Sequence, residues 1–166
     1  QIKVLRKYNI TPIYIFDGCP PEQKLLTISE RNKKQEKAKE KLEENQSFDT
    51  FKRVFRVTKY DELLLQSILD GLNVQWYKNT SCEADKFMAY LCNDKFNYEK
   101  YNMPKVHAVL TDDSDILVCG ARFLIKDFKC NSSSFTCCIY EREKMLSLLE
   151  FDNDQLIYFS MLCGSD

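Results

Sequence analysis

The chain has 166 residues, of which 44% are hydrophobic and 30% charged, and its formal net charge is −1. This composition is typical of one globular domain (residues 1–166) with a core of its own, and no apolar run is long enough to span a membrane. The eight cysteines include no C-x-x-C pair and the one histidine is His107, which argues against zinc fingers and histidine-based catalysis. We expect buried, reduced thiols in an intracellular protein.

Strand and helix patterns alternate along the first half of the chain. Residues 11–18, "TPIYIFDG", form a β-branched and aromatic run that predicts a strand, and the prolines that follow predict the start of a helix. Residues 29–46 consist mostly of helix formers but have almost no apolar stripe, so we expect a solvated helix or a flexible excursion there. The amphipathic pattern of residues 48–71 predicts a helix that ends near Gly71.

The alternation continues to the end of the chain. Further strands are expected at residues 73–77, 105–111, 122–128 and 134–140, and further helices at residues 81–92, 141–150 and 153–163. Ser81 is the expected N-cap of the first of these helices, and a turn is expected at residues 131–134. Residues 105–111, "KVHAVLT", are nearly continuously apolar, which is typical of a strand covered on both faces. The pattern predicts an α/β fold, a mostly parallel central sheet with helices on both sides.

Carboxylates stand where the predicted strands end and helices begin. The six of interest are Asp17, Glu83, Asp85, Asp113, Asp115 and Asp166. Ligands of open α/β sheets bind beyond the carboxyl ends of the strands, so these side chains are expected to converge on one rim. They would repel one another if unpaired, and ligand sets made of oxygen alone favour Mg²⁺ or Mn²⁺. The alternative is that they are helix caps and surface loop acids.

Four motifs in this chain resemble those of a known family. "IYIFDGCPPEQK", "SCEAD", "TDDSD" and "LCGSD" occur in the order and near the spacing of the flap endonuclease and xeroderma pigmentosum group G family of structure-specific 5′ nucleases. The resemblance covers nearly the whole chain, and "CEAD" and "DDSD" look somewhat closer to the exonuclease branch than to the flap branch. It implies a PIN-like nuclease core with a helical arch over residues 22–60.

The resemblance also implies an activity. The protein would hydrolyse phosphodiester bonds in DNA as a 5′ flap endonuclease or 5′–3′ exonuclease, in DNA replication or repair and in the nucleus. The six carboxylates would hold two Mg²⁺ ions, with Mn²⁺ as a possible substitute. Lys24 and Arg31 would stabilise charge on the scissile phosphate, and Arg53, Arg56 and Lys59 would bind further phosphates. The expected partner is DNA with 5′ ends or junctions between single and double strands.

The chain departs from the family pattern in several places. It begins without methionine, and we expect a fragment that lacks the family's N-terminal metal-binding aspartate, its helix–hairpin–helix element and the tail that recruits the sliding clamp. We therefore expect weak activity from these residues alone. The stretch between Asp85 and Asp113 is several residues longer than the family norm, around "NYEKYNMPK", and Cys19 replaces a residue that is often basic.

Two other functions stay open from the sequence. One is a catalytically inactive nuclease-like domain that serves RNA regulation or protein interaction. The other is a generic Mg²⁺ phosphohydrolase on a doubly wound sheet, which would not need a long basic arch.

Overall fold

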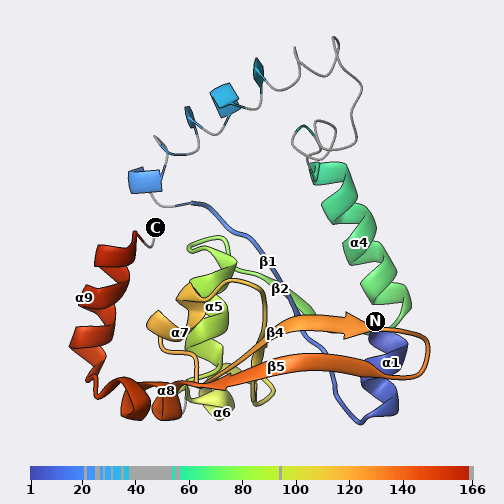
Figure 1. Cartoon of the computed structure of the whole chain (residues 1–166). Helices are drawn as coiled ribbons and strands as arrows, with labels where there is room; N and C mark the ends of the chain where they lie inside the picture. Colours follow the sequence, from blue (N-terminus) through green and yellow to red (C-terminus); the bar gives the residue numbers. More distant parts are fainter. Residues whose placement is uncertain are drawn as a thin grey trace.

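The computed structural model describes residues 1–20, 22–24, 27, 29–30, 32–34, 36–37, 54, 57–93 and 95–164. Its elements, in chain order, are α1 (Ile2–Lys7), β1 (Tyr14–Phe16), the 3₁₀ helix η1 (Glu22–Lys24), α4 (Lys59–Gly71), β2 (Trp76–Lys78), α5 (Ala84–Leu91), α6 (Tyr98–Tyr101), β3 (Val109–Leu110), α7 (Asp115–Val118), β4 (Phe123–Cys130), β5 (Phe135–Glu141), α8 (Arg142–Leu149) and α9 (Asn153–Cys163) (Figure 1). Most of the predicted arch lies outside the described residues.

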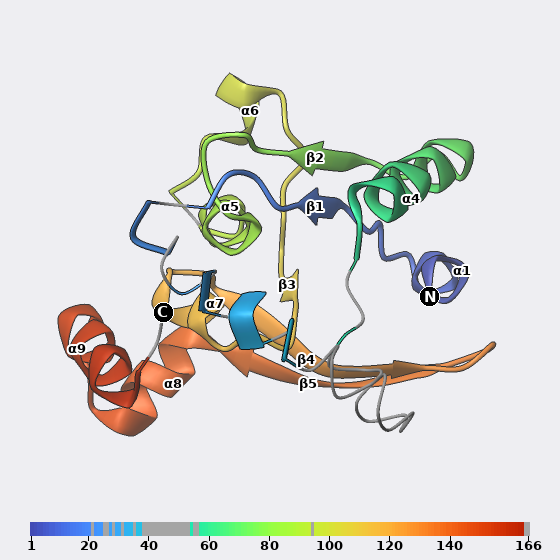
Figure 2. The ribbon, with the colours of Figure 1, turned by 90° about the horizontal axis from the view of Figure 1, so that it is seen from above.

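The described strands form two small sheets. β1 pairs with β2 in parallel, while β3 pairs in parallel with β4, which in turn pairs antiparallel with β5. Helix α5 lies on one side of β1 and β2 and α4 on the other, while both of these helices and α1 lie on the same side of the β4–β5 hairpin (Figures 1 and 2). The predicted α/β class is therefore confirmed. The strands do not join into one sheet in the described part of the chain: β3 has two residues, and the strand that it pairs with is β4.

Capping side chains fix where helices begin. The predicted helix over residues 48–71 is described continuously from residue 57 onward, and there α4 begins at Lys59. Thr58 and Asp61 form a capping box, in which the Thr58 amide donates to Asp61 Oδ2 at 2.8 Å and the Asp61 amide to Thr58 Oγ1 at 3.3 Å. The end of α4 at Gly71 agrees with the prediction.

The strand predicted over residues 105–111 is shorter than expected. Only Val109 and Leu110 are in β3, and His107 is an exposed residue before it. Val109 is 3% exposed whereas Leu110 is 41% exposed, so β3 is not covered on both faces. The apolar run therefore does not indicate two-sided burial here.

The cysteines are free thiols, as expected, but most of them are not buried. Of the eight, only Cys92 is buried, and five are exposed: Cys19, Cys119, Cys130, Cys138 and Cys163. None of the described helices is both long and apolar enough to cross a bilayer.

The main core lies between α5, α7, β3 and β4. It contains Ala89, Cys92, Val109, Ile116, Leu117, Ala121 and Leu124, and Ile116 is fully buried. Truncating such a residue to alanine typically costs about 2–5 kcal/mol of unfolding free energy. This core holds the segments that lead into the carboxylates.

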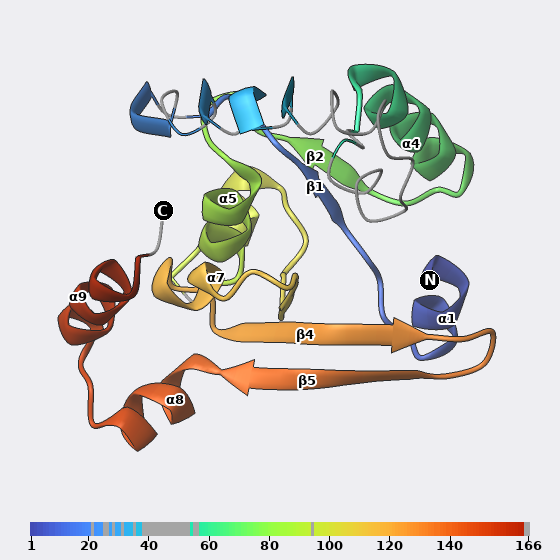
Figure 3. The same cartoon turned by 45° about the horizontal axis from the view of Figure 1, so that its top comes forward.

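The β4–β5 hairpin extends to α1, a helix that the sequence patterns did not predict (Figure 3). The Lys7 ammonium and the Tyr8 hydroxyl donate to the carbonyl of Ser133 at the hairpin tip, at 3.1 and 3.3 Å. The tip is the turn predicted at residues 131–134, where Asn131 Oδ1 accepts from the amides of Ser133 and Ser134.

The long stretch between α5 and β3 folds back on itself. Phe96, which is 7% exposed, packs edge-on against Tyr98 and stacks on Tyr101, with ring centroids 4.7 and 5.4 Å apart. The Tyr98 hydroxyl shares its proton between the carbonyls of Leu91 and Val106, which lie at the two ends of the stretch. The stretch that is longer than the family norm thus contains a one-turn helix, α6, and a small aromatic cluster of its own.

Candidate active site

Asp17 follows β1 and is bonded to the first residue of α5. Its Oδ1 accepts a hydrogen bond from the Ala84 amide at 3.1 Å. Amides in the first turn of a helix lack partners within the helix, so this carboxylate satisfies one of them and meets the positive end of the helix dipole. Ser81 is not the N-cap that the sequence predicted. The N-cap residue is Glu83, whose side chain makes no capping bond, and the cap comes from a neighbouring strand instead.

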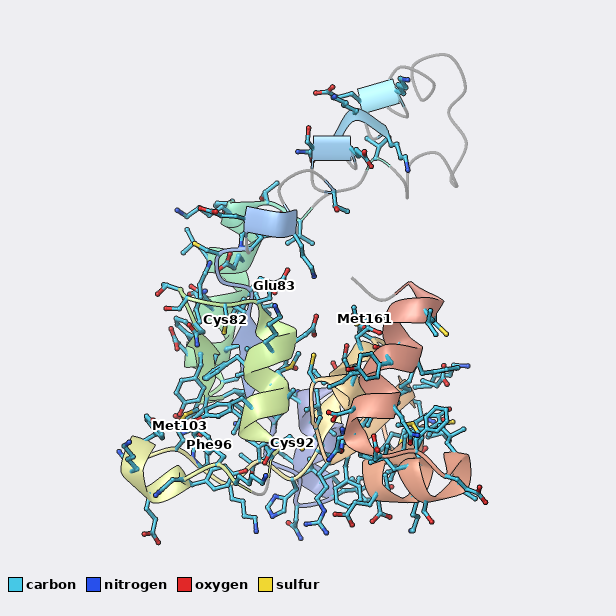
Figure 4. All side chains as sticks on the ribbon, turned by 90° about the vertical axis from the view of Figure 1, so that its left-hand side faces the viewer. Cys82, Glu83, Cys92, Phe96, Met103 and Met161 are labelled. Atoms are coloured by element: carbon cyan, nitrogen blue, oxygen red, sulfur yellow. The ribbon has the colours of Figure 1, made fainter. Side chains whose placement is uncertain are left out.

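Glu83 forms an ion pair with Lys24. The Lys24 ammonium, at the end of η1, lies 3.1 Å from Glu83 Oε2, and the two side chains are 31% and 20% exposed. Figure 4 shows Glu83 at the start of α5. Lys24, one of the two predicted catalytic cations, thus faces a predicted metal ligand.

Asp85 lies among the other acidic side chains. Its partial burial raises the pKa of its carboxyl, the negative charges of Asp113, Asp17 and Glu83 raise it further, and the positive charge of Lys24 lowers it. Three chain segments therefore bring their carboxylates within electrostatic reach of one another. We call Asp17, Glu83, Asp85 and Asp113 the acid rim.

The loop after β3 supplies Asp113 and leads to Asp115. The Asp115 amide donates to Asp113 Oδ1 at 2.9 Å, and the Asp113 amide donates to Thr111 Oγ1 at 3.2 Å. Asp115 begins α7 and adjoins the rim. Although Cys119 is exposed as a residue, partial desolvation of its thiol raises the pKa of this group, and the charges of Asp115, Asp85 and Asp113 raise it further, against the effect of Lys86.

A bulge in β4 supports this loop. The Asp127 amide donates to Asp112 Oδ1 at 3.1 Å, and the Lys126 ammonium donates to Ser114 Oγ at 2.7 Å. The pairing with β5 is irregular between Lys126 and Lys129, and Asp127 has a φ of 52°. Bulges often occur beside functional sites, where they redirect a strand. Asp112, which the sequence did not single out as a ligand, therefore links the loop that carries Asp113 to β4.

Two family models together match most of the chain, including the segments that carry the acid rim. The XPG I-region matches residues 73–166 and the XPG N-terminal domain matches residues 1–38. The chain belongs to the XPG family.

Relatives within the XPG family include flap endonucleases. The flap endonuclease 1 of Plasmodium chabaudi chabaudi is 31% identical over 181 aligned positions, which cover 98% of this chain and 36% of the relative. That of Enterocytozoon bieneusi (strain H348) is 30% identical over 95% of this chain and 44% of the relative. The chain thus spans less than half of the length of these relatives, and the resemblance expected from its motifs is confirmed.

Solved structures of XPG-type proteins share the fold. The flap endonuclease-1 from Methanococcus jannaschii is 25% identical, with a TM-score of 0.62 over 98% of this chain and 50% of that one. The catalytic core of Rad2 in complex with DNA substrate has a TM-score of 0.64 over 97% of this chain and 43% of that one, at 23% identity, which shows a likeness of fold.

The donor chemistry of the acid rim fits a hard divalent cation. Its donors are carboxylate oxygens, and the mutual repulsion that raises the pKa of Asp85 is what a cation would relieve. Within the described part of the chain, no three carboxylate, thiol or imidazole side chains form a group that could hold an ion as they stand. The carboxylates are gathered in one region, and one of them, Glu83, is paired with Lys24.

Four predicted site residues lie outside the described residues: Arg31, Arg53, Arg56 and Asp166. Lys59 is the exposed first residue of α4, and its charge is not among those that act on Asp85. The sequence reasoning missed the Ala84 amide and Asp112. Asp112 could have been found because it stands directly before the predicted ligand Asp113. A main-chain donor such as the Ala84 amide could not, because every residue except proline has one.

Proposed function

We propose that this protein is a Mg²⁺-dependent, structure-specific 5′ nuclease that hydrolyses phosphodiester bonds in DNA at 5′ flaps or free 5′ ends. The observation that carries the proposal is the acid rim, where carboxylates from three segments act on Asp85 and Lys24 is paired with Glu83. Membership of the XPG family and flap endonuclease relatives support it. Action in nuclear DNA replication or repair, and recruitment by a sliding clamp, are part of the same proposal.

The metal would be held by the carboxylates. Asp17, Glu83, Asp85 and Asp113 of the acid rim would bind two Mg²⁺ ions together with Asp115 and Asp166, directly or through water. When bound, the ions would lower the pKa of a water nucleophile and offset negative charge on the phosphate.

The side chains of the protein would position and neutralise the substrate. Lys24 and Arg31 would contact the scissile phosphate and stabilise the charge that develops on it. For Lys24 this requires an exchange of partners, because its ammonium is paired with Glu83 in the described structure. That exchange would release the Glu83 carboxylate at the moment when the substrate binds. Arg53, Arg56 and Lys59 would add salt-sensitive phosphate contacts.

The test is cleavage by the full-length protein that contains this chain. A 5′-flap duplex, a nicked duplex and single-stranded DNA are each incubated with Mg²⁺ or with EDTA. We expect Mg²⁺-dependent products with a 5′-phosphate from the substrates that have 5′ ends, and weak activity from the 166 residues alone. Binding of all three substrates without any Mg²⁺-dependent cleavage would overturn the proposal in favour of an inactive binding module.

A further inference from the structure

Gly18 lies at a very close approach between two main-chain segments. A Cβ atom at this position would stand 1.8 Å from the carbonyl oxygen of Asn79 and 2.4 Å from that of Cys82. Both are main-chain atoms, which cannot rotate away as the end of a flexible side chain can. Gly18 is not in the left-handed region of backbone space, so the requirement for glycine is steric. Any larger residue would force β1 and the loop before α5 apart.

The parallel pairing of β1 and β2 explains this approach. Phe16 lies opposite Lys78, so the segments that leave the two strands run side by side. One of them carries Asp17 and Gly18, and the other, residues 79–82, leads into α5. The contact between Asp17 Oδ1 and the Ala84 amide, at 3.1 Å, depends on this proximity. Ala84 is 8% exposed, so water has little access to its amide, whereas Asp17 itself is exposed.

We propose that Gly18 and the main-chain N–H of Ala84 are positioning groups of the acid rim. Gly18 lets the two segments touch, and the Ala84 amide then fixes the Asp17 carboxylate beside Glu83 and Asp85. Neither group contacts substrate or metal; both act through Asp17. This inference rests on the proposed function of the acid rim as the metal site.

The first test replaces Gly18 and measures metal affinity without cleavage. Gly18→Ala in the full-length protein should bind Mn²⁺ about 10- to 100-fold more weakly by calorimetry, the usual loss when a partner of a metal ligand is removed. The matched control is Gly71→Ala at the end of α4, where a Cβ would meet nothing within 4 Å. It should bind Mn²⁺ like the wild type. Melting in EDTA shows how much of each variant is folded, since a merely structural role would lower stability without changing the affinity of the folded protein.

A second variant replaces the donor, because proline has no main-chain N–H and its ring carbon takes the place of that hydrogen. Proline is tolerated at the first position of a helix, and Glu83 already has φ −64° and ψ 154°, which suit a residue before proline. Ala84→Pro should therefore keep α5 while it weakens Mn²⁺ binding about tenfold. Cleavage by this variant should recover as the Mg²⁺ concentration is raised, with the KM for DNA unchanged.

The outcomes separate the two proposals. Failure of the wild type to bind Mn²⁺ or to cut DNA would overturn the proposed nuclease function. A wild type that cuts, with wild-type Mn²⁺ affinity in folded Gly18→Ala or Ala84→Pro, would overturn the positioning role alone. Hydrogen exchange of the Ala84 amide gives a check that needs neither variant: the amide should be protected in the wild type and exchange faster in Asp17→Ala. Equal exchange in both proteins would also overturn the role.

Discussion

The two halves of the acid rim are held in different ways. On the β1–α5 side, main-chain groups hold the rim: Gly18 allows the two segments to touch, and the Ala84 amide donates to Asp17. On the β3–β4 side, side chains hold the rim, because Asp112 accepts from the Asp127 amide at the bulge and Lys126 donates to Ser114. The first half is therefore sensitive to added volume and the second to lost polar groups. An acidic residue in the second half, Asp112, can support the position of a neighbouring carboxylate without being a ligand.

The largest expected effect comes from removing one carboxylate in each half. Asp85→Asn and Asp113→Asn should each slow cleavage by at least about 10³-fold, more than the 10- to 100-fold typical for a partner of a ligand. DNA binding in Ca²⁺ should change little, because a ligand supports chemistry more than affinity. The control is Asp112→Asn, whose amide oxygen can still accept from Asp127, and it should cut within tenfold of the wild type. A large loss for only one of the two variants would mean that one half alone holds the metal.

Lys24, for which we propose a contact with the scissile phosphate, should give the next largest effect. Lys24→Ala should slow single-turnover cleavage by about 10²–10³-fold, by analogy with the loss of one donor to a developing negative charge. Affinity for DNA should fall much less because other phosphate contacts remain. Lys78→Ala is the matched control, since it also breaks an ion pair, with Glu62 at 2.6 Å. Equal losses of rate and affinity for Lys24→Ala would mean that this residue only holds the substrate.

A smaller effect on the cleavage rate should distinguish Asp112 from the carboxylates that are proposed to bind metal. Asp112→Ala removes the acceptor for the Asp127 amide and should slow cleavage about tenfold, at the low end of the effect of an outer partner. The unfolding free energy should fall by about 0.5–1.5 kcal/mol, the net value of one hydrogen bond. Chemical denaturation and single-turnover rates on Asp112→Ala and Asp112→Asn measure both quantities. If the two variants behave alike, the β4 bulge does not position Asp113.

The smallest effect concerns stability without metal. The folded protein binds the Asp85 proton more tightly than the unfolded chain, because burial and the charges of Asp113, Asp17 and Glu83 raise the pKa of this carboxyl despite Lys24. Ionised Asp85 therefore disfavours folding above its raised pKa, and this penalty disappears as the pH falls below the ordinary value of 3.8. In EDTA at pH 7, Asp85→Asn should be more stable than the wild type by less than about 1 kcal/mol, because solvent screens a partly exposed group.

Thermal melts from pH 7 down to pH 4 check this sign. The difference between Asp85→Asn and the wild type should shrink as the pH falls, and Mg²⁺ at pH 7 should stabilise the wild type more than the variant. A variant that is less stable than the wild type in EDTA at pH 7 would show that repulsion within the rim is offset by other contacts.

Strong local patterns were enough to predict several elements. Helix α9 matches residues 153–163 because Asp152 and Gln155 form a capping box just before an apolar run. The gathering of Asp17, Glu83, Asp85 and Asp113 was expected from the rule that ligands bind beyond the carboxyl ends of strands, and it occurs although β1–β2 and β3–β4–β5 are separate sheets in the described residues. Both inferences use only neighbours in sequence and the direction of strands.

Features that depend on distant contacts could not be predicted. The cap of α5 comes from Asp17, which is 67 residues from Ala84 in sequence, so Ser81 seemed the better candidate. Leu110 is exposed although its run is apolar, because burial depends on which neighbours cover β3. The residue with positive φ at the bulge is Asp127 and not a glycine, so the sequence does not reveal the bulge. The hydrogen bond from the Asp127 amide to Asp112 occurs at this bulge and was not predicted either.

The hydroxyl of Tyr98 has a consequence for how this protein tolerates changes in chain length. By bonding the carbonyls of Leu91 and Val106, it ties the base of the excursion between α5 and β3, so the two acidic segments on either side are spaced by this tie and not by the number of residues in the loop. Residues inserted after α6, around Pro104 for example, should leave the separation of Asp85 and Asp113 unchanged, because α6 carries Tyr98. The excursion is accordingly a site where a reporter peptide or an added binding segment could be inserted with the acid rim left in place.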